Sequence, residues 1–331
     1  MIDTVYFEEE VLQHPTATRV RKALPKANWV PINRFQELFN IRNQNFRIQK
    51  KNPALILAKK FENFVLPVPS GFGMNSTKNF YFSHMYNCLY DCDYCFLQGL
   101  YSSANYVLFV NYEDFFEHIS HTIEKNKNDS QMFFSGYDCD SLAFDKISGF
   151  SDQLLQFFEK YQNVEVELRT KSVVTKSLIK RPAIKNCIIA FSLSPNKIAE
   201  KLDNKAPSIR RRIKAMKDLA DCGWLIGLRF DPLIYTNDWK VQYSELICEI
   251  MGQINVSSIH SVSYGLLRFP KKMYKKISNL HNTTGLFAFP LDINNNGVTS
   301  YGKEIESEMY HFIQKELQRY LPAKKIFHCT G

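Results

Sequence analysis

Three cysteines, Cys88, Cys92 and Cys95, lie in one short stretch of the chain at the spacing C-x3-C-x2-C. Three thiolates on one loop can bind three irons of a four-iron, four-sulfur cluster, whose usual ligands are four cysteines. The fourth iron of such a cluster is then open to another ligand. The spacing therefore predicts an iron–sulfur centre with one free coordination position.

A zinc site or a disulfide framework fits the cysteine loop less well. A structural zinc site takes four ligands, often in two separated pairs; His84 could supply one more ligand, but no second pair follows the loop. A disulfide framework is typical of short secreted chains, whereas the N-terminal residues lack the basic head and apolar middle of a signal peptide. Three unrelated buried cysteines are the remaining alternative.

Strands and helices alternate from the cysteine loop onward, and these elements must position the loop. Strands are predicted at 79–85, 131–135, 164–169, 187–193, 224–230 and 259–264. Helices are predicted at 112–125, 149–161, 173–180, 208–222 and 239–254. Six strands with crossovers between them indicate a parallel sheet. We expect this sheet to curl into a partial barrel, with the active-site loops beyond the carboxyl ends of its strands.

The expected fold class is therefore α/β, with a partial (β/α)6 barrel and an extension at each end. The predicted parts are an N-terminal α/β extension at 1–78, the barrel at 79–268, and a C-terminal extension at 269–331. The last part is a possible nucleic-acid contact region and contains a predicted amphipathic helix at 303–320.

The composition is that of a basic protein with a substantial core. The chain has 331 residues, 45% of them apolar, which is enough for one large core or a core with a smaller unit beside it. No run of about eighteen apolar residues occurs, so no membrane segment is expected. Eight cysteines without an export signal predict a reducing, cytoplasmic location.

The net charge of +9 comes from 42 basic and 33 acidic residues. An excess of this size favours polyanionic partners through long-range attraction and counterion release. Basic residues cluster at 50–51, 59–60, 210–212, 271–272 and 275–276. Each of these clusters could equally be a solvated helix face.

The cysteine loop resembles that of the radical S-adenosylmethionine (SAM) superfamily, in which an aromatic residue typically precedes the last cysteine. Tyr94 occupies that position. The resemblance implies two cofactors, a [4Fe-4S] cluster and S-adenosyl-L-methionine, whose amino and carboxylate groups bind the open iron. One electron then breaks a C–S bond of SAM and releases a 5′-deoxyadenosyl radical. The implied electron donor is a protein such as a flavodoxin or a ferredoxin.

Several further stretches are similar to the spore photoproduct lyase family, whose members reverse a thymine-dimer lesion in DNA. They occur in the order found in that family, at 106–111, 170–171, 190–195, 206–208 and 231–239. The similarity extends over most of the chain and is strongest between 81 and 239. It implies a DNA-repair lyase with damaged DNA as its partner.

The resemblance also implies roles for individual residues. Lys171 matches a lysine that binds the SAM carboxylate, a suitable partner for an ammonium. Ser192 matches a serine near the methionyl group, and Asp140 matches an acidic residue at the SAM site. Tyr94 would present its backbone to the adenine and its ring to the radical pathway. Lys171 could instead be a surface lysine on a loop, and Ser192 a buried hydroxyl satisfied by the backbone.

A second group of residues is implied to contact nucleic acid. Arg268 matches an arginine in the DNA-contacting region of the family, where a guanidinium suits phosphate. Lys271 and Lys272 follow it in the sequence and add positive charge.

The hydrogen-donor region departs from the family pattern. In the family, a cysteine donates a hydrogen atom to the substrate radical, and a tyrosine quenches the resulting thiyl radical. That cysteine aligns without gaps with Tyr137, and the nearest cysteine here is Cys139. Phe96 replaces one of the two tyrosines that flank the third cluster cysteine, and it has no O–H. Three possibilities stay open: Cys139 reaches the substrate, Tyr137 donates the hydrogen, or the substrate has changed.

These observations support three hypotheses about function. The leading one is a cytoplasmic radical SAM lyase that reverses a UV-type pyrimidine lesion in DNA. The second keeps the radical chemistry but changes the substrate to an RNA or a peptide, because the donor region is altered. The third is a nucleic-acid-binding module whose cysteines hold structural zinc.

Overall fold

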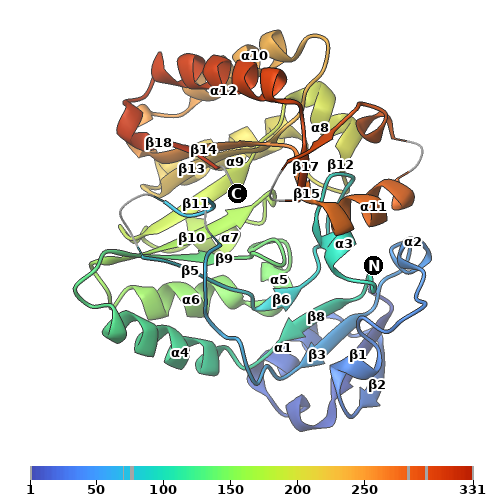
Figure 1. Ribbon diagram of the computed structural model, residues 1–331. Helices are drawn as coiled ribbons and strands as arrows, with labels where there is room; N and C mark the ends of the chain where they lie inside the picture. The colour runs from blue at the N-terminus through green and yellow to red at the C-terminus, as the bar shows by residue number, and fades with distance from the viewer. Residues whose placement is uncertain (1, 70, 75–77, 282–283, 295–296, 330–331) are drawn as a thin grey trace.

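The computed structural model describes residues 2–69, 71–74, 78–281, 284–294 and 297–329. Its main layer is a curled sheet of eight strands, and a second sheet of five strands lies at the lower right in Figure 1. In spatial order, the eight strands are β18 (Ile326–His328), β14 (Ile259–Leu266), β13 (Leu225–Leu233), β11 (Cys187–Ser192), β10 (Val164–Thr170), β9 (Gln131–Ser135), β5 (Lys78–Phe82) and β4 (Leu66–Pro67). Every neighbouring pair is parallel except β4 with β5.

Helices cover the outer face of this sheet because successive residues of its strands point to opposite faces, and those on the outer face are apolar. In β10, Val166 and Leu168 join the large hydrophobic core, whereas Glu167 between them forms an ion pair with Arg229 on the opposite face. The crossover helices are α4 (Tyr112–Lys125), α6 (Phe150–Phe158), α7 (Lys176–Ile179), α8 (Asn196–Leu202), α9 (Ile209–Asp221) and α10 (Trp239–Gln253). In the longer helices the apolar residues recur at helical spacing, and α6 packs on β10 and α9 on β13.

The predicted partial barrel is confirmed, and its six predicted strands and five predicted helices are all present. The first strand is shorter than expected. It ends at Phe82, and the chain then crosses to the second sheet as β6 (Met85–Tyr86). The crossing is fixed by His84, whose carbonyl accepts a hydrogen bond of 3.0 Å from the Phe109 N–H in that second sheet.

The second sheet is built mainly from the N-terminal part of the chain. Its strands, in spatial order, are β2 (Asn28–Ile32), β1 (Thr4–Glu8), β3 (Leu55–Ala58), β8 (Tyr106–Phe109) and β6. Helix α1 (Pro15–Ala23) and the short α5 (Asp145–Ser148) lie together beside it. Its core contains Val5, Leu55, Leu57 and Leu108. Strands β6 and β8 come from beyond residue 78, so the two sheets are interleaved in sequence.

The C-terminal residues return to the barrel. A small sheet of β15 (Arg268–Pro270), β17 (Val298–Ser300) and β16 (Asp292–Ile293) follows β14. The intervening α11 (Lys271–Leu280) packs on α3 (Leu97–Leu100), directly after the cysteine loop. Helix α12 (Lys303–Gln318) packs on α10, and β18 then adds a parallel strand beside β14.

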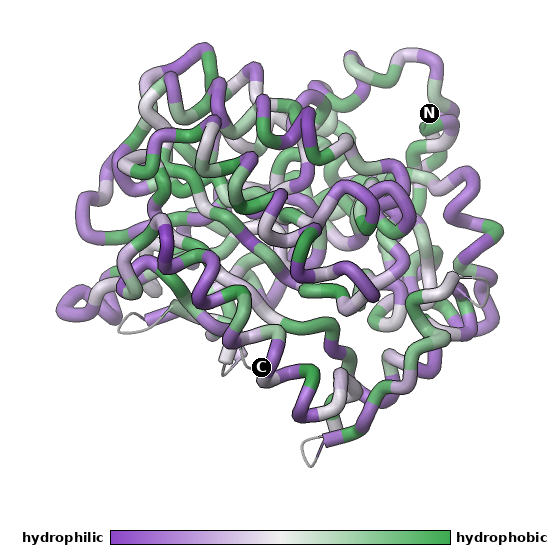
Figure 2. The backbone as a smooth tube through the Cα atoms, turned by 90° about the horizontal axis from the view of Figure 1, so that it is seen from above, coloured by the Kyte–Doolittle hydropathy of each residue, from purple (hydrophilic) through white to green (hydrophobic). Residues whose placement is uncertain are grey.

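Hydrophobic segments run through the middle of the molecule, and much of its periphery is hydrophilic (Figure 2). The inner face of the barrel also holds charge. The Arg229 guanidinium donates to both carboxylate oxygens of Glu167, at 2.6 and 3.2 Å, and to the Ser261 hydroxyl at 2.9 Å. Within the described ranges, no helix has the length and apolar content to cross a bilayer.

Candidate functional site: the cysteine loop and its surroundings

The cysteine loop begins directly after β6 and is held at its start by two polar side chains. Asn87 adopts φ 65°, a left-handed conformation that asparagine tolerates better than most residues. Its side-chain amide donates to the carbonyls of Ser103 and Asn105, each at 2.7 Å. The buried Lys50 donates to the Cys88 carbonyl at 2.7 Å. The N-terminal part of the chain therefore fixes the first cysteine.

The middle of the loop is tied to the far side of the barrel. Strand β7 (Asp91–Cys92) pairs antiparallel with β12 (Asp203–Asn204), the segment that follows α8. Arg47 forms two hydrogen bonds with the Asp91 carboxylate, at 3.0 and 3.2 Å. Gln98 donates to the Cys92 carbonyl at 2.7 Å. The loop is thus positioned by contacts from the N-terminal part of the chain and from the segment after α8.

The three thiols lie close enough to influence one another. Burial is the main cause that raises the pKa of Cys88 to about 12, with the Asp140 carboxylate and the Cys95 thiolate adding to the shift. Burial also raises the pKa of Cys92 and of Cys95, and Lys171 opposes the shift in both. Metal binding requires deprotonated thiols. A positively charged group close to the three sulfur atoms would therefore favour their thiolate forms.

The donor set fits an iron–sulfur cluster better than zinc. In a cluster the three thiolates bind different irons, whereas a zinc site brings its ligands around one ion. Among the residues that the structure describes, no three Cys, His, Asp or Glu side chains converge in a way that could hold a single ion. The ammonium groups of Lys50 and Lys171 lie near these sulfurs and would offset the negative charge of a thiolate-bound cluster.

Beside the cysteine loop, Lys171, Tyr94 and Asp203 form a buried network. The Tyr94 hydroxyl donates to the Asp203 carboxylate, which also accepts from the Arg212 guanidinium at 2.7 Å. The Lys171 ammonium lies 3.9 Å from the same carboxylate and 5.0 Å from the Tyr94 ring centre. Burial alone would lower the pKa of Lys171, but the Asp203 carboxylate raises it well above its usual range. The Asp203 carboxylate therefore favours the charged form of this buried ammonium.

Asp140 organises the loop after β10. Its carboxylate accepts hydrogen bonds from the Thr170 hydroxyl at 2.6 Å, from the Lys171 N–H at 2.6 Å, and from two N–H groups of its own loop, at 2.9 and 3.0 Å. A carboxylate has about four acceptor positions. These four bonds tie the carboxylate to its own loop and to the end of β10, and one of them holds the backbone of Lys171. The role of Asp140 at the SAM site stays a prediction.

Ser192 lies at the end of β11, near the same network. Its carbonyl accepts a 3.0 Å hydrogen bond from Arg212, which connects the end of this strand to Asp203. The structure therefore brings together the cysteine loop, Tyr94, Lys171, Asp140 and Ser192 at the carboxyl ends of the barrel strands.

The two candidate hydrogen donors occupy different environments. Tyr137 stacks on Tyr81 and makes an edge contact with Phe96, the residue directly after the third cysteine of the loop. Cys139 is buried in the core of the second sheet, beside Met85 and Phe144. The structure thus places both candidates beside the cysteine loop: Tyr137 contacts Phe96, whereas Cys139 lies in the core near Cys88.

The predicted nucleic-acid-binding residues lie at the edge of this region. Arg268 pairs with Asp231 at 3.0 and 3.3 Å, and its guanidinium lies 4.8 Å from the Phe72 ring centre. Lys271 and Lys272 begin α11 and are exposed.

Three side chains of the site were not predicted as functional: Asp203, Arg212 and His281. Arg212 was predicted only as part of a basic cluster on a helix, yet it is fully buried. His281 connects the end of α11 to the cysteine loop, with contacts of 3.2 Å to Asp93 and 2.7 Å to Gln98. A signal for Arg212 existed, because it lies three residues after Ile209 and four before Met216, on the apolar side of the helix.

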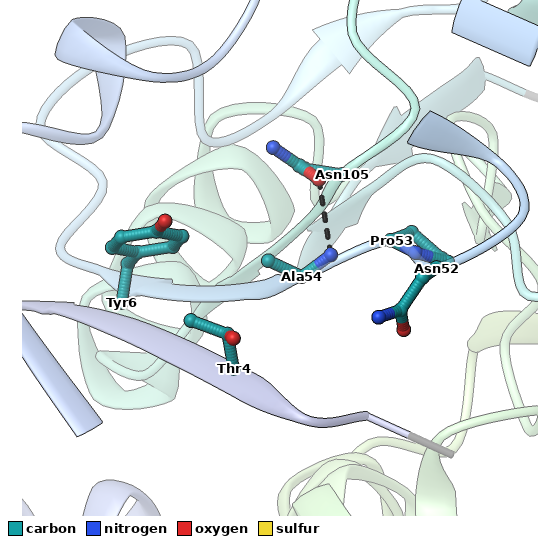
Figure 3. Close-up of a pocket in the computed structure, with 6 residues that line it drawn as sticks. All are labelled: Thr4, Tyr6, Asn52, Pro53, Ala54 and Asn105. Atoms are coloured by element: carbon teal, nitrogen blue, oxygen red, sulfur yellow. Dashed lines mark hydrogen bonds between the residues drawn. The ribbon is translucent and has the colours of Figure 1, made fainter. Parts of the chain in front are cut away.

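Two hollows at the surface lie away from this site. One, of about 190 Å³, opens beside the N-terminal sheet and is shown in Figure 3. It is lined by Thr4, Tyr6, Asn52, Pro53, Ala54 and Asn105. A hydrogen bond of 3.0 Å from the Ala54 N–H to Asn105 already satisfies part of its polar lining. None of the predicted site residues lines it.

The family model described as "Spore photoproduct lyase" matches residues 1–330. The chain belongs to the spore photoproduct lyase family. The predicted family membership is therefore confirmed. A spore photoproduct lyase from a Geobacillus strain is 21% identical over 202 residues, which cover 60% of this chain and 59% of that protein. The spore photoproduct lyase of Bacillus subtilis is 19% identical over 255 residues, covering 73% of this chain and 74% of that protein.

Solved structures of spore photoproduct lyases share the fold of this chain over nearly its whole length. A variant with bound AdoMet and dinucleoside spore photoproduct has a TM-score of 0.85 at 17% identity, and the match covers 99% of this chain and 98% of that chain. A spore photoproduct lyase complexed with dinucleoside spore photoproduct has a TM-score of 0.84 at 16% identity, with the same coverage. At these identities the likeness establishes the fold.

Proposed function

We propose that this member of the spore photoproduct lyase family is a radical SAM lyase that reverses a thymine-dimer-type lesion in DNA. The observation that carries the proposal is the position of the three thiols. They lie on one anchored loop, beside a buried lysine, at the carboxyl ends of the barrel strands. The bound dinucleoside photoproduct in similar structures supports the substrate class.

Cys88, Cys92 and Cys95 would hold the [4Fe-4S] cluster. Lys171 would pair with the carboxylate of SAM, because its ammonium is charged and already lies near the cysteine loop. Ser192 and Tyr94 would line the same cofactor site. When bound, cluster and SAM together supply a 5′-deoxyadenosyl radical, for which a flavodoxin- or ferredoxin-type donor provides the electron.

The remaining residues orient these groups. Asp140 holds the backbone of Lys171, and Asp203 holds both the Tyr94 hydroxyl and the Lys171 ammonium. Arg268, Lys271 and Lys272 would contact the phosphates of DNA. Drawing the damaged base toward the cysteine loop would cost a few kcal/mol, and least where stacking is already broken.

The test uses the full chain, reconstituted with iron and sulfide in the absence of oxygen. We expect a brown protein that cleaves SAM to 5′-deoxyadenosine under reduction, and that converts dinucleoside spore photoproduct to thymidine products measured by mass spectrometry. The Cys92→Ser variant should lose both reactions. The Cys222→Ser variant is the matched control, because Cys222 is exposed and lies outside the loop.

Two results would assign a different function. Stoichiometric zinc without sulfide would support a zinc-binding nucleic-acid module. SAM cleavage that an RNA or a peptide stimulates, without repair of the photoproduct, would show radical chemistry on another substrate.

A further inference from the structure

The loop after β9 turns sharply and points its residues in opposite directions. Gly136 adopts φ 81°, and a Cβ there would lie 2.5 Å from the Ser141 hydroxyl, so the turn requires glycine. Ser141 closes the loop, because its hydroxyl donates to the Ser135 carbonyl at 2.9 Å and its N–H donates to the Arg169 carbonyl at 3.0 Å. The loop is therefore fixed in one register, which keeps Tyr137 and Cys139 on different sides.

On one side, Cys139 is enclosed by the core near Cys88 and does not join the aromatic pair of Tyr137. It is 9% exposed and packs with the apolar residues of the second sheet. Reaching a substrate would require the loop to shift its register against the contacts made by Ser141. The thiol therefore belongs to the core.

On the other side, Tyr137 is part of an aromatic pair. Its ring centre lies 4.3 Å from that of Tyr81, with the planes inclined by 30°, a stacked arrangement. Tyr81 lies on β5, next to the apolar residues that fill the inner face of the barrel, while its neighbours Phe80 and Phe82 pack in the helix-covered core. Tyr81 therefore faces the inside of the barrel, together with Tyr137.

The surroundings of Tyr137 place it between the cysteine loop and the predicted DNA contact. The Phe96 ring meets it edge-on at 5.9 Å. The positive charges of Arg169 and Arg268 also act on its hydroxyl. Because Phe96 has no O–H, the stacked Tyr81 is the neighbouring ring through which Tyr137 could exchange a hydrogen atom.

We propose that Tyr137, and not a cysteine, donates the hydrogen atom that quenches the substrate radical, and that Tyr81 restores the Tyr137 phenol. This inference rests on the proposed function. It assigns a different donor chemistry to this chain. A stacked pair of tyrosines takes the place of the donor cysteine and of the tyrosine that quenches the thiyl radical.

The steps balance in atoms and electrons. The O–H bond of Tyr137 breaks and a C–H bond forms on the substrate radical, which leaves a neutral phenoxyl radical on Tyr137. A hydrogen atom from the Tyr81 hydroxyl then re-forms the Tyr137 phenol and leaves the phenoxyl on Tyr81. One electron from a flavodoxin- or ferredoxin-type donor and one proton from water reduce it. One electron starts each turnover and one ends it.

Two readouts test the donor role. Freeze-quench paramagnetic resonance of the reconstituted chain, with SAM and dinucleoside spore photoproduct, should show a tyrosyl signal that narrows when ring-deuterated tyrosine is incorporated. The Tyr137→Phe variant should lose the signal and form adducts of the unquenched radical, while still releasing 5′-deoxyadenosine. In the Tyr81→Phe variant the signal should persist for longer, because its quencher is missing.

Matched variants separate chemistry from folding. Tyr137→Cys should restore clean product, because a thiol also donates hydrogen. Tyr161→Phe, a tyrosine on the outer side of the barrel, and Cys139→Ala should behave like wild type. Binding of the dinucleoside to the metal-free chain, measured by calorimetry, should be unchanged in Tyr137→Phe.

Each contrary result overturns the inference. Clean product from Tyr137→Phe would exclude Tyr137 as the donor, and loss of clean product in Cys139→Ala would assign the role to the thiol. Lost dinucleoside binding in Tyr137→Phe would make Tyr137 a binding residue. A wild-type chain that cleaves SAM but repairs nothing would overturn the proposed function, and the donor role with it.

Discussion

At the residue scale, the site depends on a buried carboxylate that was not predicted from the sequence. Asp203 balances two cations, Arg212 and Lys171, and accepts the Tyr94 hydroxyl. These contacts lower the pKa of Asp203 although burial opposes the shift. Removing one partner of a buried ion pair leaves an uncompensated charge, which is far more costly than losing an exposed pair.

The Asp203→Asn variant should therefore be destabilised by roughly 3–5 kcal/mol, as measured by urea unfolding of the metal-free protein. Asp218→Asn is the matched control, because Asp218 pairs with Lys214 on the exposed side of α9. Its free energy of unfolding should change by less than about 0.5 kcal/mol. Equal losses in the two variants would show that the Asp203 network does not stabilise the site.

At the scale of elements, the close packing of α3 on α11 joins the cysteine loop to a basic helix. Gly99 makes this approach possible, since a Cβ there would lie 2.9 Å from the Met273 Cβ. The His281 contacts with Asp93 and Gln98 strengthen the same junction. A displacement of α11 should therefore also shift the cysteine loop.

The Gly99→Ala variant should force α11 away from α3. We expect a net loss of about 1 kcal/mol, because the overlap outweighs the gain in helix propensity. Amide exchange in α11 should also become faster. Gly252→Ala is the control, because nothing lies within 4 Å of a Cβ at that position of α10, and it should be neutral or stabilising. Similar behaviour of the two variants would contradict the role of this packing.

The helices and strands of the barrel were predictable because the sequence patterns that indicate them are local. Helix 112–125 was predicted with the bounds that it has, since its apolar residues recur at helical spacing. The departure at β6 was not predictable, because the run from 79 to 85 is continuously strand-like. Only its pairing with β8, about twenty residues further along the chain, moves its end to another sheet. The cysteines and Lys171 were found by motif. Asp203 was missed because its bond to Tyr94 joins residues 109 positions apart.

At the scale of the whole molecule, the net charge of +9 is distributed so that one basic helix lies beside the site. Lys271 and Lys272 are exposed at the start of α11, which packs next to the cysteine loop through α3. Contacts with phosphate release counterions, so they make binding depend on salt.

Replacing Lys271 and Lys272 together by alanine should weaken binding of photoproduct-containing duplex DNA and reduce the slope of log K against log salt by about 2. Fluorescence anisotropy at several salt concentrations measures this. The double alanine variant of Lys214 and Lys217 removes the same charge from α9, where both lysines pair with aspartates. Its slope should stay close to that of wild type. Equal slopes in the two double variants would mean that α11 does not contact DNA.

The anchoring of the cysteine loop has a consequence for the stability of the protein in air. Lys50, Asn87 and the β7–β12 pairing hold the loop through protein contacts alone. Oxidative loss of the iron should therefore leave a correctly shaped, empty protein instead of a misfolded one. Such a chain should take up iron and sulfide again without first being unfolded.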